Sequence, residues 1–166
     1  FLAAGGMIVS GCLTASRARR SVDLPVLVVI AASFALGNAM TVTGAADWIV
    51  GGLLGIGNLS PWQVLVLVYL LTVMFTELIT NNAAAVLMFP IALALAQKLD
   101  VSVLPFAVAV MFAASASFIT PLGYQTNLMV YGPGRYKFSD YLKIGVPLSL
   151  IAGAVSVTLI PMVWSF

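Results

Sequence analysis

The sequence has no histidine, one cysteine (Cys12) and few charged residues, which make up only 7% of its 166 residues. A lone cysteine excludes an internal disulfide, and without histidine the usual zinc sites and Cys–His catalysis are excluded as well. Soluble domains are about one quarter charged, because their surfaces contact water. Here 62% of the residues are hydrophobic and the mean hydropathy is +1.13. The composition therefore predicts an integral membrane protein.

The long segments without a charge include residues 24–46, 101–134 and 144–166. Each is longer than the about 20 apolar residues that a helix needs to cross a bilayer core. Several such segments in succession predict an all-α, multi-pass protein in which residues 1–166 form a single transmembrane domain. The sequence begins at Phe1 inside a hydrophobic run with no basic region ahead of it, unlike a signal peptide. We therefore expect it to be a piece of a larger protein.

The basic residues predict the orientation. Six of the seven form two clusters, which are Arg17, Arg19 and Arg20, followed by Arg135, Lys137 and Lys143. Basic residues collect on the cytoplasmic side of membrane proteins, so an even number of crossings separates the clusters. The remaining one, Lys98, then falls on the outer side.

Apolar stretches and start signals divide the chain into expected helices. Residues 24–43 read as a spanning helix, and residues 47–56 read as a short interfacial helix with Trp48 at its start. Gly51, Gly52, Gly55 and Gly57 are expected to break the chain. Ser60-Pro61 is a helix start, and Trp62 suits an interfacial anchor. Further helices are expected at 61–79, 83–97, 101–119, 127–131 and 141–164, the last capped by Ser139-Asp140.

Two polar interruptions separate these apolar stretches. The first is Thr80-Asn81-Asn82, and the second covers residues 120–126. The stretch 83–97 corresponds to about 22 Å of helix, which is short for a crossing and favours a re-entrant hairpin with the tripeptide deep in the protein. Two full spans, with the tripeptide in a cytoplasmic loop, are the alternative.

Interruptions at membrane depth persist only where protein or a wet cavity satisfies the backbone polar groups. The half-helices on either side present free N–H groups that suit an anion and free carbonyls that suit a cation. Thr80, Asn81, Asn82 and Thr120 add hydroxyl and amide groups, while Pro121 and Gly123 let carbonyls face a cation. An Asn-Asn pair is also common in ordinary loops, and a proline is often only a kink. Two such interruptions in one bundle favour a shared polar site.

Glu77 lies inside the apolar arm, three residues before Thr80. An acidic residue within a membrane segment is a functional candidate, and this one sits near the negative end of a helix. We expect a structural hydrogen-bonding role for it ahead of direct cation binding.

The same residues resemble a known family. Residues 76–85, TELITNNAAA, and residues 118–134, FITPLGYQTNLMVYGPG, are similar to signature regions of the divalent-anion:sodium symporter family, and residues 17–48 are similar to it as well. The family includes sodium-coupled sulfate and dicarboxylate carriers, within a superfamily that holds arsenite, citrate and sodium/proton transporters. One departure is an amide at Asn82, where the family has a hydroxyl.

The resemblance implies a fold and a site. The chain would be the second of two inverted repeats, with a re-entrant hairpin that enters from outside and an unwound transmembrane helix. Substrate would contact five residues, which are Thr80, Asn81, Asn82, Thr120 and Asn127. Sodium would be bound through Thr80, Asn81, Thr120, Pro121 and Gly123, with Glu77 as a coupling or structural acid.

The implied function is sodium-coupled symport of a small divalent anion, sulfate first and dicarboxylate second, in the inner membrane of a bacterium. The implied partners are the anion, sodium as coupling ion, lipid, an amino-terminal repeat and a second copy in a homodimer, with no other cofactor and no nucleic acid. An arsenite or sodium/proton antiporter of the same superfamily and an ion channel are the alternatives. An enzyme is disfavoured, because Glu77 has no histidine or second buried acid to act with.

Overall fold

The computed structural model describes residues 2–12, 14–20, 24–54 and 59–166 of the chain. Its regular elements are helices, namely α1 (Leu2–Val9), α2 (Ala15–Arg20), α3 (Leu24–Val42), α4 (Ala45–Leu54), α5 (Pro61–Leu78), α6 (Asn81–Lys98), α7 (Val103–Ser115), α8 (Gln125–Tyr131) and α9 (Phe138–Val163). The described residues contain no strand, so the all-α prediction is confirmed for them. The break predicted at Gly51 and Gly52 is wrong, because both glycines lie inside α4. Gly55 and Gly57, which were predicted to break the chain as well, lie outside the described residues.

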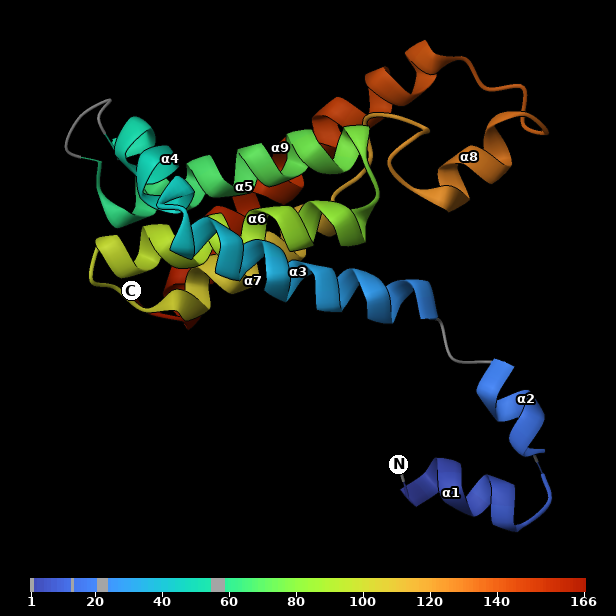
Figure 1. Cartoon of the computed structure of the whole chain (residues 1–166). Coiled ribbons are helices and arrows are strands. Elements are labelled where there is room, and N and C mark those ends of the chain that lie inside the picture. The colour runs from blue at the N-terminus through green and yellow to red at the C-terminus, as the bar shows by residue number, and fades with distance from the viewer. Residues whose placement is uncertain (1, 13, 21–23, 55–58) are drawn as a thin grey trace.

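Helices α5, α6 and α7 pack against one another and form the centre of the bundle (Figure 1). Helix α9 packs on α5 and α7, whereas α3 and α4 pack on α6. Helices α1 and α2 lie away from the bundle, and α8 stands beyond one of its ends.

The core sits between α5, α6 and α7. On α7 the buried residues recur at helical spacing, so they form one face. They are Phe106, Ala109, Val110 and Ala113, and they meet Val64, Leu65, Val68 and Tyr69 of α5 and Met88, Ala92, Leu95 and Ala96 of α6. The many alanines let the helices approach closely, as is common between helices in membranes.

The outer faces of these helices are apolar too. Met111 and Phe112 of α7 and Leu150 and Ile151 of α9 are exposed. A helix that is apolar on all sides needs an apolar surrounding such as lipid. Among the described residues, Pro61–Leu78 and Phe138–Val163 are long and apolar enough to cross a membrane. The fold therefore agrees with the membrane prediction.

Helix ends near the two interruptions differ from expectation. The first interruption is narrower than predicted, because α6 begins at Asn81 rather than at Ala83. Thr80 caps α6, and its hydroxyl accepts the N–H of Ala83 (3.3 Å). The helix predicted over 101–119 stops at Ser115 instead. The N–H groups of Ile119 and Thr120 bind a carboxylate rather than helix carbonyls, so the second interruption starts earlier than the polar sequence does.

The starts of α5 and α9 show what capping signals can predict. The predicted start at Ser60 is confirmed, because Ser60 and Gln63 exchange hydrogen bonds in a capping box. The cap predicted at Ser139-Asp140 was wrong by two residues, because the N-cap residue of α9 is Lys137. Helix α9 begins at Phe138, and Asp140 lies within its first turn, where its carboxylate accepts the N–H of Lys137 (2.9 Å).

Candidate functional site

Two helix connections lie at the same end of the bundle. We call residues 76–82 the tip, which comprises the end of α5, the connecting residues 79 and 80 and the start of α6. The break (residues 116–124) is the non-helical connection from α7 to α8. Because α6 and α7 are joined at their other ends and pack side by side, the tip and the start of the break come together. Thr76 Oγ1 donates to the carbonyl of Ala114 (2.7 Å), and Ser117 Oγ donates to the carbonyl of Thr76 (3.4 Å). The tip and the break therefore lie against each other, while the shared polar site predicted for them stays a prediction.

Glu77 connects the tip to the middle of the break. Its side chain is 7% exposed. One carboxylate oxygen accepts the N–H of Ile119 (2.8 Å), and the other accepts the N–H of Thr120 (2.7 Å). Thr120 Oγ1 in turn donates to the main-chain carbonyl of Glu77 (2.9 Å). The carboxylate thus holds two successive backbone N–H groups of the break.

Three polar groups converge around the side-chain amide of Asn81. One end of its amide lies 2.8 Å from Thr76 Oγ1, 3.1 Å from the carbonyl oxygen of Gly123 and 3.2 Å from that of Ala114. All three neighbours are oxygen atoms. The amide nitrogen can donate to them, whereas the amide oxygen there would complete a set of four oxygens. We call Asn81, Thr76, Gly123 and Ala114 the oxygen cluster.

The close contact between tip and break depends on Gly123. A Cβ atom at this position would lie 2.0 Å from Ser117 Oγ and 2.4 Å from the carbonyl oxygen of Thr76. Real Cβ atoms essentially never come within 3.0 Å of such neighbours. Only glycine allows the backbone of the break to lie this near the tip.

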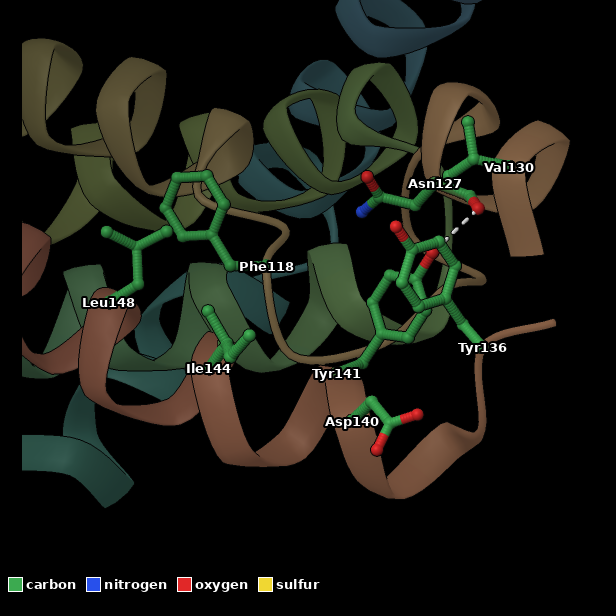
Figure 2. A pocket seen from close by; sticks show the side chains of 9 residues that line it. Phe118, Asn127, Val130, Tyr136, Asp140, Tyr141, Ile144 and Leu148 are labelled. Carbon is green, nitrogen blue, oxygen red and sulfur yellow. Dashed lines mark hydrogen bonds between the residues drawn. The ribbon is translucent and has the colours of Figure 1, made fainter. Parts of the chain in front are cut away.

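Asn127 supports the break from α8. Its Nδ2 donates to the carbonyls of Ser117 (3.1 Å) and Thr120 (3.5 Å), and its own carbonyl accepts the hydroxyl of Tyr141 (3.0 Å). Asn127 also lines a cavity of about 290 Å³ between the break, α8 and α9 (Figure 2). The walls are mostly apolar and aromatic and include Phe118, Val130, Tyr136, Tyr141, Ile144 and Leu148.

The structure brings some predicted site residues together and leaves others apart. Asn81, Gly123 and Thr120 lie within one hydrogen-bonded network with Glu77. Thr80 and Asn82 are exposed at the tip, and Pro121 is buried in the break. No ligand contact tests the roles predicted for these residues, so they stay predictions.

Sequence reasoning missed two members of this network, Thr76 and Ala114, and one residue that packs against the break, Gly145. Thr76 could have been noticed as a hydroxyl inside an apolar arm, one helical turn before Thr80. Ala114 contributes a main-chain carbonyl, for which no sequence signal exists. Gly145 of α9 lies against the break, since a Cβ there would meet the carbonyl oxygen of Phe118 at 2.1 Å. A glycine within a long apolar helix was the available signal.

Comparison with known proteins identifies the family. Residues 1–166 match the family described as CitMHS, citrate transporter. The chain belongs to this family. It is 42% identical to Uncharacterized transporter sll0640 of Synechocystis over 95% of the chain and 26% of that protein. It is 40% identical to Sodium/sulfate cotransporter 2 of Chlamydomonas reinhardtii over 90% of the chain and 18% of that protein, and 27% identical to mouse Solute carrier family 13 member 1 over 78% and 22%.

These relatives confirm the resemblance to divalent-anion:sodium symporters and place the chain among transporters rather than enzymes. Membership in this family also indicates a membrane protein. The chain spans about a quarter of the length of the curated relatives it matches, or less.

Proposed function

We propose that this chain is the carboxy-terminal repeat of a secondary transporter that carries a small divalent anion together with sodium. Sulfate is the first choice of substrate, because relatives that are 35–40% identical are named sodium/sulfate cotransporters. A dicarboxylate is the second choice. The observation that carries the proposal is the oxygen cluster, which joins the tip to the break.

The oxygen cluster suits sodium for a simple electrostatic reason. With the Asn81 amide oxygen facing inward, four oxygens lie close together and only the Thr76 hydroxyl has a proton to share. Hard cations such as sodium are bound by carbonyl, amide and hydroxyl oxygens like these. Without the cation, the amide nitrogen can turn inward and donate to the same atoms. Asn81 and Gly123 would then be sodium ligands as predicted, with Thr76 and Ala114 in addition. Ligand roles for Thr80, Thr120 and Pro121 stay predictions.

The charge of the region favours coupling between anion and cation. Residues 61–97 contain one charged side chain, Glu77, and residues 101–134 contain none. An anion bound between the tip and the break would therefore meet no lysine or arginine from these segments. Sodium and the helix N-termini would supply the positive charge. Thr80 and Asn82 at the exposed tip are the side chains that we propose for the anion. A substrate role for Asn127 stays a prediction, because its Nδ2 already donates to the carbonyls of Ser117 and Thr120.

The helix lengths support placing the site inside the membrane. The predicted helix over 83–97 was too short for a full span, which favoured a re-entrant hairpin. Helix α6 has 18 residues, or about 27 Å, so its length is compatible with either arrangement. Helix α7 has 13 residues, or about 20 Å, which is too short to cross. The break therefore lies at depth if α7 starts at the outer surface near Lys98. The tip contacts the break, so α5 and α6 form a re-entrant hairpin.

The remaining parts of the proposal concern assembly and location. One repeat holds only half of a site that forms between inverted repeats, so an amino-terminal repeat completes it. We place the transporter in the inner membrane of a bacterium as a homodimer, with the basic residues Arg135, Lys137 and Lys143 on the cytoplasmic side.

Uptake of labelled sulfate by proteoliposomes that contain the full-length transporter tests the proposal. We expect saturable uptake with an inward sodium gradient and none when potassium replaces sodium. Asn81→Ala should abolish uptake, because it removes the amide from the oxygen cluster, while thermal unfolding stays near that of the wild type. Gln97→Ala, which removes an exposed amide at the far end of α6, is the matched control. Unsaturable conductance would indicate a channel, proton-driven exchange an antiporter, and wild-type rates in Asn81→Ala would refute the cluster as the site.

A further inference from the structure

Glu77 is the one charged side chain of the tip, and its contacts run to the break. Both carboxylate oxygens are used by the N–H groups of Ile119 and Thr120, at 2.8 and 2.7 Å. Hydrogen bonds of a charged acceptor are shorter and stronger than neutral ones. The carboxylate is thus already committed to the protein backbone.

These two bonds fix the direction of the neighbouring carbonyls. In a trans peptide the C=O points away from the N–H of the same unit. With the N–H groups of Ile119 and Thr120 held by Glu77, the carbonyls of Phe118 and Ile119 must face the other way. The carbonyl oxygen of Phe118 does lie against Gly145 of α9, on the side of the break that faces away from Glu77.

A second path leads from Glu77 to the oxygen cluster. The main-chain carbonyl of Glu77 accepts the hydroxyl of Thr120 (2.9 Å), and the same hydroxyl accepts the N–H of Gly123 (3.3 Å). The carbonyl of Gly123 is a member of the cluster. Glu77 therefore holds Thr120 from both its side chain and its main chain, and Thr120 holds Gly123.

We propose that Glu77 is a positioning residue, which sets the geometry of the oxygen cluster through Thr120 and Gly123 without itself binding sodium. This inference deepens the proposed function and rests on it for its effect on transport. It also implies that the N–H groups of Ile119 and Thr120 do not bind the substrate anion, because the Glu77 carboxylate occupies them.

Glu77→Gln tests the proposal in the full-length transporter. The amide keeps one acceptor but turns an NH₂ group toward the second backbone N–H, so one of the two bonds is lost. We expect uptake to stay sodium-dependent. The sodium concentration for half-maximal uptake should rise about ten-fold, because one charge-assisted hydrogen bond is lost. Asp100→Asn, the same exchange at an exposed acid between α6 and α7, should leave that concentration unchanged.

A double-mutant cycle separates positioning from a direct ligand role. Thr120→Val removes the hydroxyl that joins Glu77 to Gly123 and should raise the half-maximal sodium concentration in the same direction. Because both variants interrupt one path, the combined change should be smaller than the product of the separate changes. Thr120→Ser keeps the hydroxyl, so it should change the half-maximal sodium concentration less than Thr120→Val does. This comparison provides a test even if Glu77→Gln does not fold.

Hydrogen–deuterium exchange gives a readout that does not need transport. In Glu77→Gln, peptides that contain Ile119 and Thr120 should exchange at least about ten-fold faster, whereas peptides from the core of α7 should not. Unchanged exchange, a wild-type sodium dependence or sodium-independent uptake would each overturn the positioning role. If the wild type shows no sodium-dependent uptake but exchange changes as expected, the proposed function fails and the positioning role stands.

Discussion

Gly123→Ala gives the sharpest test of the contact between the tip and the break. A Cβ at this position would lie 2.4 Å from the carbonyl oxygen of Thr76 and 2.0 Å from Ser117 Oγ. Ser117 can turn its hydroxyl aside, but the Thr76 carbonyl is backbone. Contacts shorter than 3.0 Å essentially never occur, so the two segments must separate by about 0.6 Å. Ordinary contact at 3.4 Å requires a separation of about 1.0 Å.

A shift of this size is large for the oxygen cluster. The Asn81 amide and the carbonyl of Gly123 are 3.1 Å apart, so a further 0.6–1.0 Å would break their contact. A misplacement of about 1 Å can reduce the rate of a site about 100-fold. Overpacking also costs about 1–3 kcal/mol of stability. We therefore expect sodium-dependent uptake to fall about 100-fold in Gly123→Ala, with a lowered unfolding temperature.

The assay is sulfate uptake by proteoliposomes, with thermal unfolding measured on the same preparations. Gly132→Ala at the end of α8 is the matched control, because a Cβ there meets nothing within 4 Å. The double variant Gly123→Ala/Ser117→Ala removes the hydroxyl clash but not the clash with Thr76, so it should remain inactive. Near-normal uptake in Gly123→Ala would show that the break does not lie against the tip in the working transporter.

Two further predictions concern α9. Gly145→Ala should destabilise the protein and reduce uptake, because the new Cβ would lie 2.1 Å from the carbonyl oxygen of Phe118; unfolding temperatures equal to those of Gly132→Ala would contradict this packing. Trp62→Phe should lower the free energy of unfolding by about 1 kcal/mol, because Trp62 Nε1 donates to the carbonyl of Val157 (3.0 Å). Within α9 the N–H of residue 161 would bind this carbonyl, but residue 161 is a proline and has no N–H. Pro161→Ala should restore a donor to that carbonyl, so thermal unfolding should show rescue of Trp62→Phe.

Membrane character and most helices could be predicted from the sequence, because they depend on local composition. Uncharged apolar runs require lipid or a core, and Ser60-Pro61-Trp62-Gln63 contains its own capping groups, so α5 begins where the sequence indicates. The family could be recognised for a related reason, since short signature segments such as 76–85 carry it. These inferences need no knowledge of which helices are neighbours.

The end of α7 and the composition of the site depended on the tertiary structure. Residues 116–119 read as apolar helix, yet Glu77, about forty positions earlier in the chain, binds the N–H groups that would have continued α7. The carbonyl of Ala114 joins the oxygen cluster only because α7 packs beside the tip. Main-chain atoms have no sequence signature, and a side chain shows no partner until the chain has folded. The sequence therefore determined which segments interrupt the helices, and packing decided which of their atoms face one another.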